Sequence, residues 1–461
     1  MASKQDAAWK LARHLADTRF EDLTLDAVEA TKKSILDTLG VMVAASGIAP
    51  ECRLLVDLIG EAGGKEESSI IGFGGRVPAW MAAFVNGALG HCLDYDDLFY
   101  EAPVHPSSPV VAAALAVAER EGHVTGKQFV TAVALGNDLT CRLGLAMRWK
   151  MDWNPTTVLG AFGAAAASGK VLGLNEDELV SALGIALSEA TGTQEMRYSV
   201  GNHLGGMRDG YPARGGVLSA LMAKQGIIGP ENCFEGRAGL FNVYFGGDVD
   251  RNALMRDLGK KFEGTRVAIK AWPTCGTSHV YIDATLRIAS EQNLKPQDIA
   301  AITLHVGDFA MLHCQPIEER RRPQTSADAK YSIPFCAAIA ATRRRVTIND
   351  LTLEGIKDPA VVDMAQKVNP KLDARFNAEK GEPPGMVEIT AKTGKSYSKQ
   401  LEFGYGHPGN PVSNEDVIQK FRDCVSCSAK PVSETAVERV IEMVMKIEEV
   451  RDIRDIVRPL S

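Results

Sequence analysis

Three carboxylates and a histidine precede an apolar run in the segment "GHCLDYDDLFYEAPVHPSSPVVAAALA", residues 90–116. Asp94, Asp96 and Asp97 lie within four residues, and His105 follows in a proline-bounded turn. Imidazole titrates near neutrality, so His105 is a candidate proton-transfer group that a neighbouring carboxylate could orient. The same residue types also form solvated helix caps and turns, so spacing alone leaves both roles open.

Four further segments place polar residues in sequence that otherwise has the composition of a protein core. They are "MRWKMDWNPTTVLGAFG" (147–163), "NHLGGMRDGYPARGG" (202–216), "IKAWPTCGTSHVYID" (269–283) and "DAKYSIPFC" (328–336). Each is a turn containing Gly or Pro that leads into an apolar helix. Helix N-termini expose unpaired N–H groups, so several converging termini would form a site for carboxylates. Arg208, Arg214 and Lys270 could add positive charge, and His279 is a second candidate proton carrier.

Other kinds of site have weaker support in the sequence. The acids 94, 96 and 97 with His105 could bind a divalent metal, but adjacent acids on one short segment rarely converge without distant ligands. No Gly-rich loop has the strand–turn–helix context of a nucleotide site. Cys424 and Cys427 have zinc-ligand spacing, yet no second pair accompanies them, so we interpret them as incidental thiols. We therefore expect no metal and no organic cofactor.

The residue patterns of the elements that would position these residues differ between the first and the second part of the chain. From residue 5 to about 225 apolar residues recur at helical spacing, and small residues such as Gly160, Ala164, Ala165 and Gly169 predict close helix packing. Beyond residue 267, "IAAITLHVGDF" and "GMVEITAKTGKSYSKQLEFG" are rich in β-branched residues, the second predicting a hairpin that turns at Thr393–Gly394. The predicted fold is mainly α with an α+β second domain. The expected boundaries are a helical domain at 1–267, an α+β lid domain at 268–403 and a helical segment at 404–461 that packs back on the first domain.

The composition and charge of the chain disfavour a nucleic-acid-binding, membrane or secreted protein. The 461 residues are 45% apolar, and the net charge of -7 is spread without a basic face, which disfavours a nucleic-acid partner. The most apolar tract, 158–174, is interrupted by Lys170, so no membrane partner is expected. The first twenty residues mix charges of both signs, unlike a signal peptide, and nine unpatterned cysteines fit a reducing cytoplasm. The expected localisation is cytoplasmic.

Taken together, these segments resemble the MmgE/PrpD family, most clearly in "GHCLDYDD…VHPSSPVVAAALAVAE", "NPTTVLGAFGAAAASGKVLGL", "FEGRAGLFNVYFGG", "KAWPTCGTSHVYIDA", "DAKYSIPFCAA" and "GHPGNPVS". The family includes 2-methylcitrate dehydratase, cis-aconitate decarboxylase and iminodisuccinate epimerase. The resemblance implies a homodimer without an organic cofactor, a small di- or tricarboxylate substrate, and a site between the domains. By matching motif it assigns family site positions to Asp94, His105, Lys270 and His279.

The same resemblance shows departures at several expected site positions. Leu98 stands where decarboxylase-like members carry Thr, and Asn154 where they carry His. Arg208 and Tyr211 replace a lysine and a histidine, and Phe335 replaces a tyrosine. These differences make decarboxylation of cis-aconitate the less expected reaction.

The shared chemistry implied by the resemblance is removal of a proton next to a carboxylate. His105, oriented by Asp94, would be the base or would deliver the proton, while Lys270, Arg208 and His279 would hold carboxylates. In a dehydratase His279 or Tyr211 would protonate the leaving hydroxyl. Further substrate contacts are expected from three residues: Asn154, Arg214 and Asp97. Dehydration of a 2-methylcitrate-like hydroxy-polycarboxylate is expected first, and epimerisation of an iminodisuccinate-like dicarboxylate second. A cis-aconitate-type decarboxylase and a non-catalytic polycarboxylate-binding relative remain alternatives.

Overall fold

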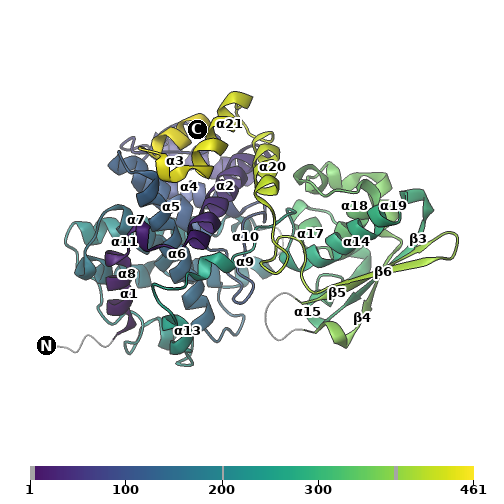
Figure 1. Ribbon diagram of the computed structural model, residues 1–461, viewed down its shortest axis with the longest axis horizontal. Coiled ribbons are helices and arrows are strands. Elements are labelled where there is room, and N and C mark those ends of the chain that lie inside the picture. The colour runs from purple at the N-terminus through teal and green to yellow at the C-terminus, as the bar shows by residue number, and fades with distance from the viewer. Residues whose placement is uncertain (1–5, 200–201, 378–382) are drawn as a thin grey trace. The chain divides into compact units, whose positions relative to one another are not determined.

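The computed structural model describes residues 6–199, 202–377 and 383–461 of the chain (Figure 1). Contacts divide the chain into two compact units, each described here by itself. Unit 1 is Met1–Val267 with Asn414–Ser461, and unit 2 is Ala268–Ser413. The second boundary falls at residue 413 rather than 403, because the loop after residue 403 packs within unit 2. A Cβ on Gly404 would lie 2.7 Å from the Val280 amide nitrogen.

Unit 1 is helical, as the apolar periodicity predicts, apart from a short two-stranded sheet of β1 (Ser68–Ser69) and β2 (Arg76–Val77). Its helices are α1 (Ala7–Asp17), α2 (Leu25–Ile48), α3 (Pro50–Ala62), α4 (Ala79–His91), α5 (Ser107–Glu121), α6 (Gly126–Ala146), α7 (Pro155–Val171), α8 (Glu176–Glu189), α9 (Glu195–Tyr198), α10 (Leu204–Met207), α11 (Gly210–Lys224), α12 (Leu240–Val243), α13 (Arg251–Met255), α20 (Asn414–Val425), α21 (Glu434–Met445) and α22 (Arg454–Val457). With the mixed sheet of unit 2, this arrangement confirms the predicted fold class.

Small residues let the central helices of unit 1 approach one another closely, as the sequence predicts. A Cβ on Gly216 of α11 would lie 2.4 Å from the Ala164 Cβ of α7. A Cβ on Gly160 would lie 3.0 Å from Pro109 Cγ of α5. Real Cβ atoms do not approach this closely without overpacking, so these positions require glycine.

The crossing of α4 and α11 is one of these close contacts, and it positions part of the candidate site. A Cβ on Gly87 would lie 2.7 Å from the Asp209 carbonyl oxygen, and one on Gly210 would lie 2.3 Å from the Phe84 carbonyl oxygen. Gly87 is one helical turn before His91, so the crossing brings residue 209 alongside the C-terminal end of α4.

We expect Gly87→Ala to destabilise the protein by about 1–3 kcal/mol, because the added methyl forces the two helix backbones apart. Urea unfolding of the purified variant measures this change. Gly60→Ala is the matched control: Gly60 lies within α3 with nothing within 4 Å of its added Cβ, so alanine should be neutral or slightly stabilising. Equal effects at the two positions would contradict the packing argument.

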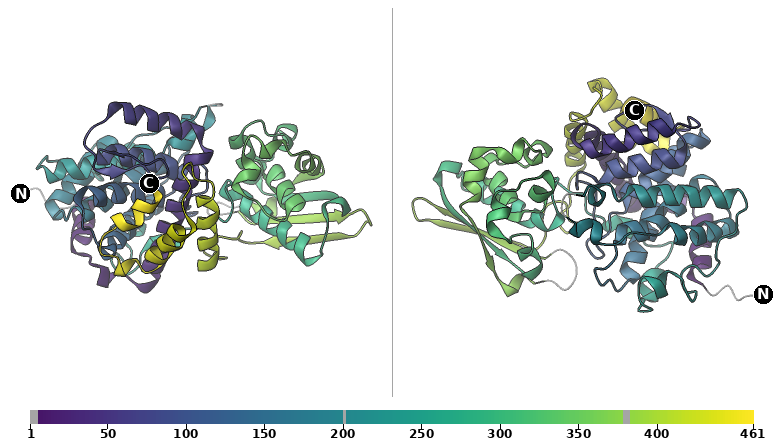
Figure 2. Two further views of the ribbon diagram at one scale, coloured as in Figure 1. Left: turned by 90° about the horizontal axis from the view of Figure 1, so that it is seen from above. Right: turned by 180° about the vertical axis from the view of Figure 1, so that it is seen from behind.

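The C-terminal segment completes unit 1 by packing on α2, as the sequence predicts. Figure 2 shows α20 and α21, coloured yellow, beside the purple N-terminal helices, and both contact α2. Lys420 of α20 is buried, its Nζ lying 2.5 Å from the Asp37 carboxylate of α2 and 2.7 Å from the Tyr95 carbonyl oxygen. Helix α20 therefore holds the turn that carries the acids 94–97.

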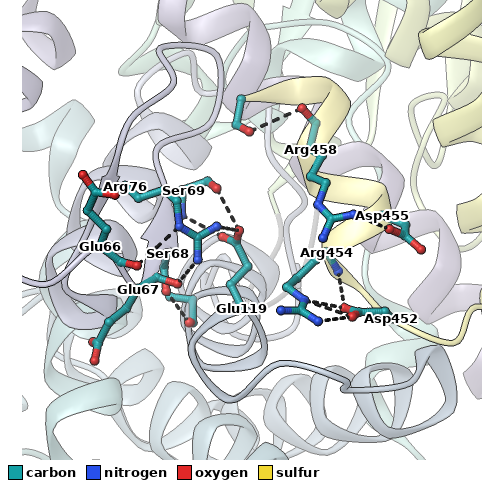
Figure 3. Close-up of polar contacts among 12 residues, drawn as sticks. Glu66, Glu67, Ser68, Ser69, Arg76, Glu119, Asp452, Arg454, Asp455 and Arg458 are labelled. Atoms are coloured by element: carbon teal, nitrogen blue, oxygen red, sulfur yellow. Dashed lines mark hydrogen bonds and ion pairs between the residues drawn. The ribbon is translucent and has the colours of Figure 1, made fainter.

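The β1–β2 sheet is joined to the C-terminal end of α5 by a buried carboxylate (Figure 3). Glu119 accepts hydrogen bonds of 2.8 Å from both the amide and the hydroxyl of Ser69, and Arg76 lies 3.4 Å from it. Burial raises the pKa of Glu119, although these donors oppose that effect. The interaction fixes the far end of α5, whose N-terminal end begins just after His105.

Unit 2 is a four-stranded mixed sheet in the order β4-β3-β5-β6 with helices against one face (Figure 1). The strands are β3 (Ile299–Val306), β4 (Val368–Leu372), β5 (Gly385–Ala391) and β6 (Ser396–Leu401). The helices are α14 (His279–Glu291), α15 (Asp308–Met311), α16 (Ile317–Arg321), α17 (Ser326–Lys330), α18 (Ile333–Arg343) and α19 (Pro359–Ala365). The buried core between them includes Tyr281, Phe335 and Ile302.

The hairpin of β5 and β6 turns around Gly394, whose φ is 86°, as predicted from the sequence. Strand β4 was not predicted, because "PAVVDMAQKVN" reads as one helix. That helix ends at Ala365, and Val368–Leu372 then pairs in parallel with β3. Pro370 is tolerated there because β4 is an edge strand.

Within the described residues no single helix is long and apolar enough to cross a membrane. In the part of the chain that the structure describes, one pair, α2 with α3, reaches that length and composition, and these two helices meet at a 91° bend.

Candidate active site

The acidic turn begins where α4 ends at His91. Asp94 has a φ of 52°, the left-handed conformation that Asp and Asn adopt more readily than most residues, and its amide donates to the His91 carbonyl at 2.7 Å. This reversal turns the chain back toward the last turn of α4. Asp96 can therefore face His91, five residues earlier in the sequence.

The Asp96 carboxylate is fully buried between two imidazole rings. Nδ1 of His91 lies 3.0 and 2.9 Å from its two oxygens, and Nδ1 of His105 lies 3.2 Å from Oδ2. The two rings stand edge to face with centroids 4.7 Å apart. Burial alone would raise the pKa of Asp96, but the facing charges and hydrogen bonds of the two histidines outweigh it and hold that pKa well below its usual range. Asp96 is thus an ionised acceptor shared by two donors.

The His105 ring is oriented by contacts that define which nitrogen carries its proton. Nδ1 also lies 2.8 Å from the Asp97 carbonyl oxygen, which can only accept, so Nδ1 is the N–H donor and Nε2 keeps a lone pair. The His105 amide donates to Thr156 Oγ1 of α7 at 3.0 Å, fixing the backbone at the start of α5. This arrangement suits Nε2 to act as a base.

Asp97 is fully buried, and both of its carboxylate oxygens have protein donors. Oδ1 accepts from the Ser107 amide at the start of α5 at 3.2 Å, and Oδ2 accepts from the Ser34 hydroxyl at 3.3 Å. Burial, with the like charges of Asp37 and Asp96, raises its pKa to about 7, although Ser107 acts against that change. Asp97 thus accepts from the first residue of α5, and the substrate contact expected of it stays a prediction.

Because the folded-state pKa of Asp97 is raised above its unfolded value of 3.8, its contribution to stability is complete below that value and lost as pH rises through about 7. Asn at this position keeps the acceptor for Ser107 without the charge. We expect Asp97→Asn to gain stability relative to the parent by about 3 kcal/mol between pH 5 and pH 8. Urea unfolding at both pH values measures the difference; a pH-independent difference would contradict the titration.

A second buried acid lies on the other side of His91. Asp209, at the start of α11, has Oδ2 3.6 Å from His91 Nδ1 and Oδ1 3.6 Å from Arg208 Nε. Burial raises the pKa of Asp209 to about 6, although His91 and Arg208 oppose it. Burial and the nearby Arg208 lower the pKa of His91. Arg208 is buried beside this cluster, where its Nη1 donates to the Gly205 carbonyl at 2.6 Å.

Ligand atoms of His91, Asp96 and His105 all lie within 4.8 Å of one another, a spacing that a cation could use. The sequence did not predict this convergence, because one member comes from the preceding helix. However, a cation bound to His105 Nδ1 would have to displace the proton donated to the Asp97 carbonyl. Hydrogen bonding accounts for the geometry of all three residues.

Three other predicted residues have structural contacts of their own. Asn154 caps α7, its side chain accepting from the Thr157 amide at 3.1 Å. Tyr211 is half-buried against Phe84, with ring centroids 5.1 Å apart. Arg214 stacks over both rings and lies 3.9 Å from Glu189. Their expected roles toward a substrate stay predictions.

Lys270 and His279 belong to unit 2, and both are buried there. His279 begins α14, its Nε2 3.2 Å from the Trp272 carbonyl oxygen and its ring 5.2 Å from the Trp272 ring. Phe335, the expected substitute for a site tyrosine, lies fully buried in the core of unit 2. Cys424 and Cys427 are free thiols whose pKa values are raised by burial.

Sequence reasoning did not assign roles to four residues that complete the cluster in unit 1: His91, Asp96, Thr156 and Asp209. The expected orienting acid was Asp94, whereas the carboxylate at His105 Nδ1 is that of Asp96. A usable signal was present for Asp96 and His91, since a five-residue separation across a helix end allows a reversal of this kind. Thr156 and Asp209 come from distant segments, and only the packing of α5 on α7 and of α4 on α11 brings them close.

Comparison with known proteins agrees with this architecture. Residues 9–252 match the MmgE/PrpD N-terminal domain and residues 272–448 match the MmgE/PrpD C-terminal domain. A cis-aconitate decarboxylase of Aspergillus terreus is 25% identical over 96% of this chain and 93% of its own length. The human cis-aconitate decarboxylase is 27% identical over 93% of this chain and 89% of its own. The 2-methylcitrate dehydratase of Salmonella typhimurium is 23% identical over 84% of each chain. With both domain matches following in order along two compact units, the chain belongs to the MmgE/PrpD family.

Proposed function

We propose that the protein is a lyase that removes a proton next to a carboxylate of a small hydroxy-polycarboxylate and releases water. The observation that carries this proposal is the state of His105: its Nδ1 proton is directed to the Asp97 carbonyl and to Asp96, which leaves Nε2 as the base. Relatives named 2-methylcitrate dehydratase support dehydration.

Each residue of the cluster has a distinct part in this mechanism. His105 Nε2 takes the proton, and the resulting imidazolium is stabilised by the buried charge of Asp96. Arg208, a buried cation next to Asp209, supplies positive charge for a substrate carboxylate. Tyr211 supplies the proton for the leaving hydroxyl. Lys270 and His279 keep the family roles implied by their motifs, whereas Asp96 takes the orienting role first expected of Asp94.

Decarboxylation of an unsaturated tricarboxylate is the second candidate reaction. Relatives named cis-aconitate decarboxylase match 93–96% of this chain, whereas those named 2-methylcitrate dehydratase match 78–84%. The same imidazole would then deliver a proton to the carbon that loses carbon dioxide. Leu98 and Asn154 remain the departures that weigh against this reaction.

Proton and carbon NMR in deuterium oxide, with a chelator present, tests the proposal. The substrates supplied singly are 2-methylcitrate, citrate, cis-aconitate and iminodisuccinate. An alkene signal arising from either hydroxy acid supports dehydration, and released bicarbonate from cis-aconitate supports decarboxylation instead. Deuterium uptake at iminodisuccinate without elimination would indicate an epimerase. Binding of these acids without any turnover would indicate a non-catalytic relative and contradict the proposal.

A further inference from the structure

The Asp96 carboxylate faces two histidines, and only one of them is needed for the chemistry proposed above. We propose that His91 is a positioning residue that sets the basicity of His105 through their shared acceptor, Asp96. This inference rests on the proposed role of His105 as the base. It adds a residue whose own contact with substrate is not required.

The geometry of the shared carboxylate is the first support. His91 Nδ1 approaches both Asp96 oxygens at nearly equal distances of 3.0 and 2.9 Å, whereas His105 Nδ1 approaches only Oδ2, at 3.2 Å. A carboxylate that accepts from two donors divides its negative charge between them. His91 therefore takes part of the stabilisation that would otherwise go to the His105 imidazolium.

Burial strengthens the electrostatic coupling between Asp96 and the two histidines. His91 is 2% exposed, Asp96 is completely buried and His105 is 8% exposed, so water does not screen the three groups from one another. The contact with Asp96 is also closer than that between His91 Nδ1 and Asp209, which is 3.6 Å. The dominant partner of His91 is thus Asp96.

Other ionisable groups face the cluster from every element packed around it. Arg208 and Asp209 lie on the α10–α11 side, Asp94 and Asp97 belong to the same turn, and the Lys420–Asp37 pair holds that turn from α20 and α2. A substitution at residue 91 leaves these groups in place, but it removes the His91 contact that lowers the pKa of Asp209. Removing the His91 donor concentrates the Asp96 charge on His105, which lies 3.2 Å from Asp96 Oδ2.

The predicted sign is therefore an increase in the pKa of His105. We expect His91→Leu to raise it by about one pH unit, the size expected for loss of one hydrogen bond to a charged acceptor. The acid limb of the kcat/KM profile should move to higher pH by the same amount, because a protonated His105 cannot act as a base. A residue that serves only for packing would lower turnover or stability without moving this limb.

The matched substitution is His91→Asn, whose side-chain amide places an N–H close to the position of Nδ1. Its acid limb should stay within about 0.3 pH unit of the parent. His91→Gln places its amide near the Nε2 position and should resemble leucine. If His91→Leu does not fold, the acid limbs of His91→Asn and His91→Gln are compared instead. The inference then requires the His91→Gln limb to lie at higher pH than the His91→Asn limb.

A second readout does not depend on turnover. Carbon-13 labelling of histidine Cε1 gives resonances whose titration reports each ring, and the His105 resonance is assigned by its loss in His105→Gln. The His105 midpoint should rise in His91→Leu and remain at the parent value in His123→Leu, since the His123 side chain is 90% exposed. A midpoint in His91→Leu within about 0.3 unit of the parent overturns the inference. Absence of turnover with every polycarboxylate would instead contradict the proposed function, and this titration would still decide the role of His91.

Discussion

Replacement of His105 by Gln should lower kcat/KM by about 10³-fold with little change in substrate affinity, because it removes the proton carrier and leaves the rest of the cluster in place. Glutamine can reach toward the position of Nε2, but its amide nitrogen cannot accept a proton. The measurement is initial rate with whichever polycarboxylate is turned over, together with calorimetric binding of the same compound.

Two comparisons make the His105→Gln result specific. His123→Gln alters an exposed ring and should leave the rate unchanged. Circular dichroism and urea unfolding should show that His105→Gln remains folded. Turnover within tenfold of the parent would contradict the assignment of His105 as the base.

Asp96→Asn should lower kcat by about 10²- to 10⁴-fold, because the imidazolium formed at His105 loses its buried counter-charge. The sign of the accompanying pH effect is opposite to that expected at residue 91. Without the carboxylate, the pKa of His105 falls, so the acid limb of the rate profile should move to lower pH. The pH–rate profile of the variant measures both changes.

Asp94→Asn separates the two acids that could orient His105. If Asp96 is the orienting group, Asp94→Asn should leave the acid limb in place even where it reduces the rate. A downward shift of the limb in Asp94→Asn, with none in Asp96→Asn, would restore the role that the sequence assigned to Asp94. The 3.2 Å contact of Asp96 with His105 Nδ1 is the reason to expect the first outcome.

The fold was largely predictable because helical periodicity and β-branched runs report local structure. The α+β unit, its first strand and its hairpin all follow from these patterns. Strand β4 did not, since Val368 is its one fully inward residue and its other positions are more exposed. A half-solvated edge strand following a helix carries almost no periodic signal.

The candidate site was predictable in its residue types and less so in their roles. His105 was singled out from the sequence because a histidine beside several acids is chemically conspicuous. The acid at His105 Nδ1 was taken to be Asp94 because the left-handed backbone of Asp94, which directs Asp96 toward His91, is only weakly signalled by sequence: Asp adopts that conformation more readily than most residues but does so rarely. Asn154 was expected at the substrate, yet the Asn-Pro-Thr-Thr order is also that of a helix cap.

The contact of Lys420 with the Tyr95 carbonyl has a consequence for biosynthesis. A chain made from its N-terminus completes the acidic turn early, but the lysine that holds this turn follows all of unit 2 along the chain. The intervening residues 268–413 can collapse around their own core while the first unit still lacks α20. His105, the proposed base, therefore reaches its final setting only late in translation, and a nascent chain arrested before residue 414 should carry every member of the cluster without being active.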